Sequence, residues 1–301
     1  MTVSDIELAS LAASHDIISL GMLADDLRRR RHGVRTTFVR VADVPVAPRS
    51  EPHSSGASLP PAAGEIRIVG TPASRAAAVE RVAEIAALIS AARDVPLSGF
   101  SLADLEALSA REGVTLRALL EDLRAAGLEL VAEAPFDRLQ NARRSIEEVN
   151  IAGLALARLT VHQSPAADPL PLLKAVADLQ RAVAVIRAFA PLPRTLNPAV
   201  PTTGYEDVKR VALARVVVDN IASIQVDWSL YGPKLAQVAL MFGADDIDGV
   251  SPDDDSPEGR RRAPLEEIRR NIRAASQDPI ERNGRFDAVN GPSDYARAPQ
   301  A

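Results

Sequence analysis

The stretch that decides the fold is VKRVALARVVVDNIASIQVDWSLYGPKLAQVALMFGADDIDGV, residues 208–250. It continues an apolar-striped helix predicted over 205–220, and then holds a strand over 222–228 and a second helix over 233–242. The segment DDIDGV that follows is predicted to be a further strand. Helices and strands that alternate in this way predict parallel strands joined by helical crossovers.

The same alternation runs through most of the chain. Further strands are predicted at 35–41, 64–70, 128–134, 154–161 and 183–192, and long helices at 74–93 and 169–182. Seven or eight strands in one chain favour the α/β class and a (β/α) barrel of TIM type. Only a loop rich in Pro and Ser joins the first two strands, where a parallel pair needs a crossover. We therefore expect the barrel to be partial or open at its first βα unit.

The pattern predicts four parts along the chain. They are an N-terminal helical segment at 1–34, a (β/α) barrel at 35–250 with a flexible loop at 42–64, a C-terminal helical extension at 251–287 and a disordered tail at 288–301. The loop has many prolines and serines and no apolar periodicity, which is typical of a segment without regular structure.

Composition excludes several classes of function. The 301 residues are 47% hydrophobic and carry a formal net charge of −5, which gives no basic footprint for nucleic acid or an anionic membrane. The basic run RRRRH at 28–32 ends a predicted helix, where the dipole favours cations, so we interpret it as structural. Without an apolar run long enough for a bilayer or a signal-peptide pattern, we expect a cytoplasmic protein.

The chain contains no cysteine. This absence excludes disulfides, thiolate zinc sites, a cysteine nucleophile and any cysteine-ligated iron–sulfur cluster.

Several segments resemble one family of enzymes. HDIISLGMLADDLRRRRHGVRTTFV, EIRIVG, AFAPLPRTLNP, the stretch 208–250 and PIERNGRF follow one another as in the radical-SAM enzymes of the futalosine pathway to menaquinone, most of all the aminofutalosine synthases. The resemblance implies a TIM-type barrel and, in the family, a [4Fe–4S] cluster held by three cysteines after the first strand. That place is taken here by ADVPVAPRSEPHSSG, so the cluster is expected to be absent and no cofactor is expected.

The departures from the family concentrate at the cofactor end. The family's Gly-rich stretch that contacts S-adenosylmethionine resembles LVAEAPF here, which keeps Glu133 and loses the glycines. The case for S-adenosylmethionine binding is correspondingly weak. Another family motif resembles TVH, which keeps His162.

The best candidate site residues lie in the last predicted strand. Strand alternation places Asp246 and Asp248 on one face and Asp245 on the other. Because function in such barrels sits at the carboxyl ends of strands, Asp248 is a candidate substrate contact. The alternative is a solvated acidic turn. No metal site is predicted, since two carboxylates without a nearby histidine give only part of an oxygen shell.

Four further residues are candidates for substrate binding. His162 and Glu133 match family motifs, although either can be an ordinary polar residue at a strand end. Lys234 starts a helix, where the dipole disfavours a cation, which suggests an anionic partner or simply an exposed side chain. Asn220 also matches the family, with a helix cap as the alternative.

Two hypotheses of function follow. The first is a cysteine-less, non-catalytic homologue that binds a small molecule of the menaquinone pathway or associates with a cluster-bearing relative. The second is an enzyme that uses the same barrel pocket without a cluster, with His162 and Asp246 or Asp248 as working groups. No catalytic set of nucleophile, base and orienting group is visible in the sequence.

Overall fold

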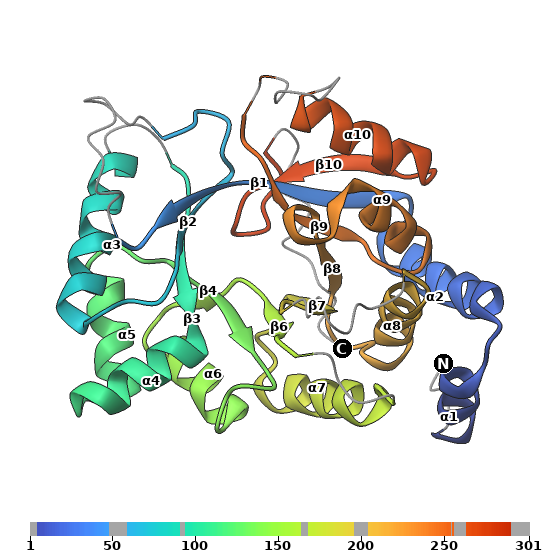
Figure 1. Cartoon of the computed structure of the whole chain (residues 1–301), viewed down its shortest axis with the longest axis horizontal. Helices are drawn as coiled ribbons and strands as arrows, with labels where there is room; N and C mark the ends of the chain where they lie inside the picture. The colour runs from blue at the N-terminus through green and yellow to red at the C-terminus, as the bar shows by residue number, and fades with distance from the viewer. Residues whose placement is uncertain are drawn as a thin grey trace.

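The computed structural model describes residues 5–47, 59–90, 94–163, 168–195, 204–253, 255 and 263–289. A parallel barrel with helices outside it forms the body of the molecule (Figure 1). The strands are β1 Arg35–Pro45, β2 Glu65–Val69, β3 Leu97–Ser101, β4 Leu130–Pro135, β5 Ala155–Leu156, β6 Leu159–Val161, β7 Ala188–Pro193, β8 Ser223–Asp227, β9 Asp246–Val250 and β10 Asp278–Arg282.

Two helices precede β1, and helices follow most of the later strands, as in a βα repeat. They are α1 Asp5–Ala13, α2 Ile17–His32, α3 Arg75–Ser90, α4 Leu102–Glu112, α5 Leu116–Ala125, α6 Ala142–Ile151, α7 Leu170–Val183, α8 Gly204–Val217, α9 Trp228–Met241 and α10 Pro264–Ala274. The core between barrel and helices is built mainly from Leu, Val, Ile and Ala, as the low aromatic content requires. None of the helices in the described residues has the length and apolarity needed to cross a bilayer.

The barrel is closed, so the prediction of a TIM-type barrel is confirmed while the expected opening at its first βα unit is wrong. Strand β1 pairs with β9 through Thr37 and Asp246, and with β2 through Val41 and Glu65. Two features close the ring without a helix between β1 and β2 in the described residues. First, β1 is eleven residues long and continues to Pro45, into the range predicted as a loop. Second, β10 pairs with its first half.

The strand β10 was not predicted, since the segment 251–287 was expected to be helical. Its helix is present as α10, but residues Asp278–Arg282 then add a parallel strand to the first half of β1. The second half of the same edge of β1 is taken by β2, which starts opposite Val41. One long strand therefore serves two shorter neighbours in succession. The predicted loop centre, 48–58, and all but the first two residues of the predicted tail lie outside the described residues.

The N-terminal helical segment is two helices rather than one. Helix α1 ends at Ala13, and Asp16 caps α2 by accepting a hydrogen bond from the backbone N–H of Ser19 at 3.0 Å.

The basic run at the end of α2 is structural, as predicted. Arg28 is fully buried and pairs with Asp25 at 2.9 Å. Arg31 donates to the carbonyl oxygen of Ile221 at 2.7 Å, and His32 bonds that of Ala222 at 3.0 Å. These contacts tie α2 to the turn before β8.

Candidate functional site

The carboxyl ends of the barrel strands surround a cavity of about 230 Å³. This is the end at which TIM-type barrels carry their active sites. Seven charged side chains are in its lining, three of them arginines: Asp43, Arg67, Asp104, Glu133, Arg158, Arg194 and Asp227. The cavity also contacts the polar side chains of Thr71, Ser101 and Ser229 and the ring of Phe100.

The floor of the cavity is a buried ion-pair cluster centred on Asp248. Arg67 donates from Nη1 and Nη2 to its two carboxylate oxygens, at 3.0 and 2.8 Å, and Arg158 donates from Nη1 to Oδ2. Arg67 also donates from Nε to Glu65 at 2.9 Å, and Glu65 accepts from Ser98. Burial alone would raise the pKa of Asp248, but Arg158 and Arg67 outweigh it and hold that pKa well below its usual range.

Asp246 lies one inward-facing position below Asp248 and has its own arginine. The guanidinium of Arg282, at the end of β10, donates from Nε and Nη2 to its two oxygens at 2.6 Å each. Thr37 and Gln225 donate to the same carboxylate at 2.5 and 2.7 Å. With four donors and no exposed surface, Asp246 is a structural tie between β1, β8, β9 and β10.

A second pair of carboxylates lies at the rim. Arg194, directly after β7, bridges Glu133 and Asp227 at 2.9 Å each. His162 follows β6, and its Nε2 lies 2.9 Å from Glu133 Oε1. Burial would raise the pKa of Glu133, but the hydrogen bond from His162 and the charges of Arg194 and Arg158 lower it to about 2. Glu133 is therefore an ionised acceptor that holds the imidazole in place.

Two donors at the cavity have no hydrogen-bond partner among the described residues. Arg158 is 3% exposed, and its Nε is buried and unpaired. The hydroxyl of Ser101 on the same cavity is also buried and unpaired. An unpaired buried donor typically costs 1–3 kcal/mol, which makes these two positions the strongest sign of an absent ligand or water.

Asp43 completes the cavity wall from β1. Desolvation against its neighbours raises the pKa of its carboxyl group, and Arg67 lowers it again only in part. The raised pKa of Asp43 favours the neutral form of this carboxyl group.

The structure brings four of the six predicted residues together. Asp246, Asp248, Glu133 and His162 all belong to the lumen or its rim, and Asp245 bonds Arg215 on the opposite face of β9, as strand alternation predicted. The alternative of a solvated acidic turn is excluded, because all three aspartates are buried. His162 contacts Glu133 and not the aspartates, which are bonded to arginines.

The other two predicted residues lie away from the cavity. Lys234 is exposed on the outer side of α9, and among the described residues it has no hydrogen bond or ion pair. Asn220 lies before β8, at the amino end of the barrel, where its Nδ2 donates to the carbonyl oxygen of Ala177 at 2.8 Å. Both positions disfavour a part in ligand binding at the cavity.

Sequence reasoning missed the four lumen arginines, Arg67, Arg158, Arg194 and Arg282. A signal was available for two of them. Arg67 interrupts EIRIV and Arg158 interrupts LALARLTV, at positions where an otherwise apolar barrel strand faces inward. A charged residue in such a place requires a buried partner, and the inward aspartates of the last strand supply it.

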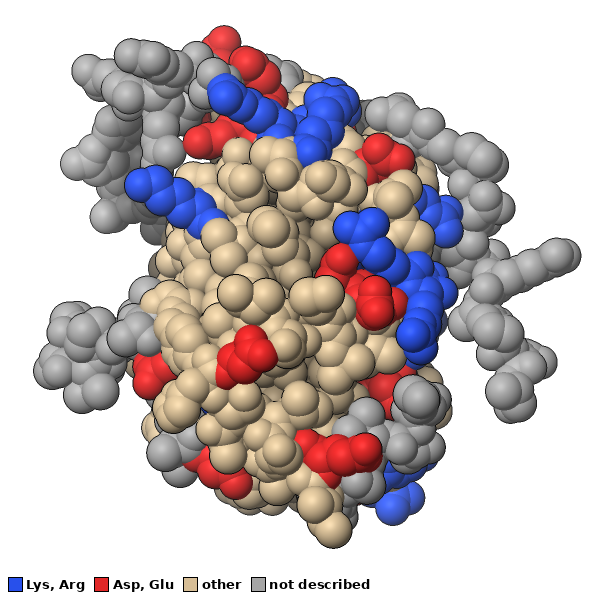
Figure 2. Space-filling model, turned by 90° about the vertical axis from the view of Figure 1, so that its right-hand side faces the viewer, with Lys and Arg blue, Asp and Glu red and all other residues tan. Residues whose placement is uncertain are grey.

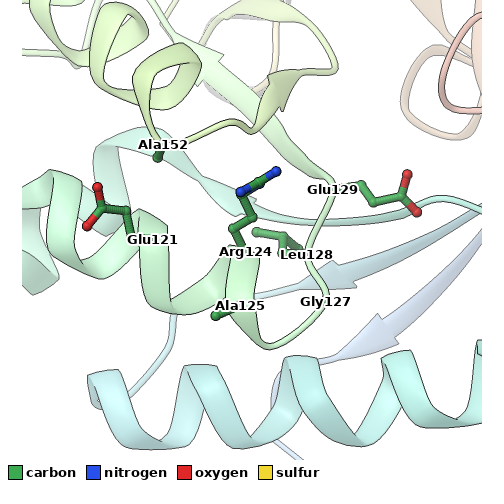
Figure 3. A pocket seen from close by; sticks show the side chains of 7 residues that line it. All are labelled: Glu121, Arg124, Ala125, Gly127, Leu128, Glu129 and Ala152. Carbon is green, nitrogen blue, oxygen red and sulfur yellow. The ribbon is translucent and has the colours of Figure 1, made fainter.

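Larger hollows lie at the amino end of the barrel. One of about 360 Å³ is lined by Glu121 and Arg124 of α5, the turn after it and Ala152 (Figure 3). Another of about 580 Å³ lies between β4, α6 and the segment 284–287. Conserved chemistry in TIM-type barrels sits at the opposite end, and in Figure 3 Glu129 points away from Arg124, so these side chains do not converge.

The residues present do not fit an iron–sulfur cluster. The chain supplies no thiolate, and the described residues contain no group of three or more His, Asp or Glu side chains placed to hold a metal ion.

Comparison with known proteins finds relatives of part of the chain. Residues 192–295 match the family model of the CofH/MqnC C-terminal region. The cyclic dehypoxanthine futalosine synthase of Streptomyces coelicolor is 28% identical over 199 residues, 60% of this chain and 49% of that protein. The aminodeoxyfutalosine synthase of the same organism is 34% identical over 93 residues, 29% of this chain and 24% of that protein. The matched region thus spans half or less of the length of these relatives.

Solved structures agree on the fold. Methylornithine synthase (PylB) matches with a TM-score of 0.64 over 93% of this chain and 94% of that one, at 12% identity, which shows the barrel architecture alone. The matched C-terminal region and the two relatives support a likeness of this cysteine-free chain to the futalosine-pathway radical-SAM enzymes.

Proposed function

We propose that this protein binds a small polar molecule in the cavity at the carboxyl end of its barrel, and that it does so without an iron–sulfur cluster and without turnover. The observation that carries the proposal is the pair of unpaired buried donors, Arg158 Nε and Ser101 Oγ, on one cavity. A ligand with oxygen or nitrogen acceptors for these two donors removes two unsatisfied groups at once.

The charge of the lumen supports a ligand that is not a simple anion. The lumen and its rim hold four arginines against seven carboxylates: Arg67, Arg158, Arg194 and Arg282 against Asp43, Glu65, Asp104, Glu133, Asp227, Asp246 and Asp248. A further negative charge is therefore opposed, whereas a neutral acceptor with a donor group toward Asp43 is favoured. The matched relatives are named for aminodeoxyfutalosine and cyclic dehypoxanthine futalosine, which are therefore the first ligands to test.

The proposed lack of turnover rests on how the titratable groups are held. Asp246 and Asp248 are fixed by arginines, and Glu133 is fixed by Arg194 and His162. A general acid or base must be able to exchange a proton near the operating pH, and the lowered pKa values of Asp248 and Glu133 make these two carboxylates poor at it.

The alternative is a cluster-independent enzyme, and one contact favours it. Glu133 orients the imidazole of His162, as a carboxylate orients the base in known acid–base pairs. In that case His162 is the base and Glu133 its positioning residue, rather than the pairing of His162 with an aspartate that the sequence suggested.

Calorimetry tests the proposal. Aminodeoxyfutalosine, cyclic dehypoxanthine futalosine and S-adenosylmethionine are titrated into purified protein, and then into Arg158→Lys and Ser101→Ala. The lysine retains the charge facing Asp248 but has no Nε donor, so we expect binding at least ~10-fold weaker with an unchanged fold. Arg124→Lys, in the hollow at the other end of the barrel, is the matched control.

Three outcomes contradict the proposal. Binding of none of the three ligands removes the small-molecule role, and binding unchanged by both lumen variants places the site elsewhere. If mass spectrometry shows that a bound ligand is converted, and His162→Ala abolishes this conversion, the enzymatic alternative is established.

A further inference from the structure

The outer face of α2 and α9 exposes large apolar side chains. We define the α2–α9 face by Ile18 and Met22 of α2 and by Val238 and Met241 of α9, which are 70, 68, 41 and 52% exposed. Ile18 and Met22 are four positions apart, and Val238 and Met241 three apart, so each pair forms a ridge on its helix. The face is thus built from two apolar ridges.

The two ridges lie side by side. Helices α2 and α9 meet where Gly21 faces the ring of Phe242, so closely that a Cβ on Gly21 would lie 2.7 Å from that ring. Gly21 falls between Ile18 and Met22, and Phe242 directly follows Met241. The contact that joins the helices therefore also brings their exposed ridges together into one surface.

Exposed apolar side chains concentrate on this side of the molecule. In the described residues, ten large apolar side chains are exposed, and seven of them lie on α1, α2, α8, α9 or the turn before β1: Ile6, Ile18, Met22, Val34, Tyr205, Val238 and Met241. Figure 2 faces this side and shows a broad area almost free of charge, with most charged side chains at its margins. Single exposed apolar residues are normal, but such a concentration marks an interaction surface.

We propose that a second copy of this chain covers the α2–α9 face. The absence of charge from the four side chains that define the face agrees with this partner. An uncharged surface also complements itself in any two-fold arrangement, whereas a nucleic acid or an anionic membrane requires a basic surface.

The charges beside the ridges fit a two-fold axis. Helices α2 and α9 each lead into a barrel strand through a short turn, so both run toward the amino end of the barrel. Lys234 is exposed near the start of the α9 ridge, and Asp26 is exposed beyond Met22 toward the end of α2. A two-fold axis that lies in the interface and runs across the two helices reverses their ends, which brings Lys234 to the same end of the interface as Asp26 of the second copy. This pairing gives a role to the unusually placed cation.

Molar mass in solution tests the proposal. Light scattering behind size exclusion, at micromolar concentrations of the full chain, is expected to give twice the 32.0 kDa of one chain. The double variant Met22→Glu/Val238→Glu places charges in both ridges and is expected to raise the dimer Kd at least ~10-fold. Ile151→Glu on α6, where the side chain is 57% exposed, is the control that leaves the mass unchanged.

A charge exchange tests the orientation of the copies. Lys234→Glu is expected to weaken the dimer, because it places two negative charges opposite each other. Lys234→Glu/Asp26→Lys is expected to restore it, because the charges at both positions are then exchanged. Circular dichroism confirms that each variant is folded.

A monomeric wild-type protein overturns the proposal, as does a dimer that the ridge variant leaves intact or the Ile151→Glu control disrupts equally. A wild-type monomer that forms a one-to-one complex with a cluster-bearing relative assigns the face to that partner instead of a second copy. If the double variant Met22→Glu/Val238→Glu weakens the dimer but Lys234→Glu/Asp26→Lys does not restore it, the two-fold pairing of Lys234 with Asp26 is overturned. Because none of these variants touches the lumen, ligand binding there remains an independent measurement.

Discussion

Asp248 and Arg67 form a two-point ion pair across the inside of the barrel, although 181 positions separate them in the sequence. The planar guanidinium matches the two carboxylate oxygens, at 2.8 and 3.0 Å, and so fixes the direction of both side chains. Since Arg67 belongs to β2 and Asp248 to β9, the pair joins the two strands on either side of β1.

Removing the acid from this pair is expected to be costly. Asp248→Asn leaves Arg67 and Arg158 buried without their shared anion, and the free energy of unfolding should fall by about 3–5 kcal/mol. Urea unfolding followed by circular dichroism measures the change. Asp178→Asn, at a pair with 65% and 66% exposed side chains, should stay within about 0.5 kcal/mol. Equal effects of the two variants would contradict the assignment of Asp248 to a buried cluster.

Glu133 is expected to make stability depend on acid pH. Its pKa is about 2 in the fold and 4.5 as the reference value. The unfolded chain therefore binds the proton first as pH falls, so the contribution of Glu133 is present above pH 4.5 and is lost between about 4.5 and 2. Glu133→Gln should lower stability at pH 7 by about 1–3 kcal/mol and flatten this loss.

Unfolding free energies measured from pH 7 down to pH 4 test this prediction at the upper edge of the window. Glu147→Gln, whose carboxyl is half-exposed on α6, should leave the slope unchanged. A slope that stays the same in Glu133→Gln would show that the pKa of this group is not lowered by folding.

His32 is also expected to lower the stability of the fold as pH falls, but in a higher pH range than Glu133. Burial lowers its pKa below the ordinary 6.5, and Asp245 offsets this only in part. The unfolded chain takes up the proton first, so stability should decline as pH falls below about 6.5. His32→Gln should reduce this decline, and thermal unfolding between pH 7.5 and 5.5, with exposed His15→Gln as control, measures it. An identical pH dependence in both variants would disprove the effect.

Position 21 is expected not to tolerate any side chain larger than that of glycine. An alanine inside α2 would normally gain about 0.5–1 kcal/mol over glycine, but here its Cβ meets the Phe242 ring at 2.7 Å. We expect Gly21→Ala to destabilise by about 1–3 kcal/mol overall, because the tight contact outweighs the helix preference. Adding Phe242→Leu should recover part of the loss, and chemical unfolding of the single and double variants gives the coupling. A stabilising Gly21→Ala would contradict the packing of α2 against α9.

The barrel could be predicted because its signal is local. The alternation in residues 208–250 corresponds to α8, β8, α9 and β9, and the two-residue period placed Asp246 and Asp248 inside and Asp245 outside. Closure could not be predicted, since it depends on β1 being long enough to pair with β9, β2 and β10 in turn. That pairing joins residues from both ends of the sequence, and no periodicity within one segment reports it.

The site was predicted only in its acidic half. Inward aspartates at the end of a barrel strand follow from periodicity and the barrel rule, and His162 and Glu133 came from the family resemblance. Their partners depend on which strands face each other across the lumen, as with Arg67 and Asp248. Lys234 lies away from the cavity, and this could not be predicted, because a helix start shows an unusual charge but not which side of the helix carries it.

The pairing of β1 with β9 and β10 also sets when the molecule can fold during its synthesis. Thr37 must wait for Asp246, 209 residues later, before their strands can join. At ribosomal rates of ~5–20 residues per second this delay is roughly 10–40 s. Throughout that time the edge of the first strand has none of the neighbours that later come from the C-terminal part of the chain. Nascent-chain folding should therefore begin in the middle of the sequence. The first strand is the segment that a ribosome-associated chaperone is expected to bind for longest.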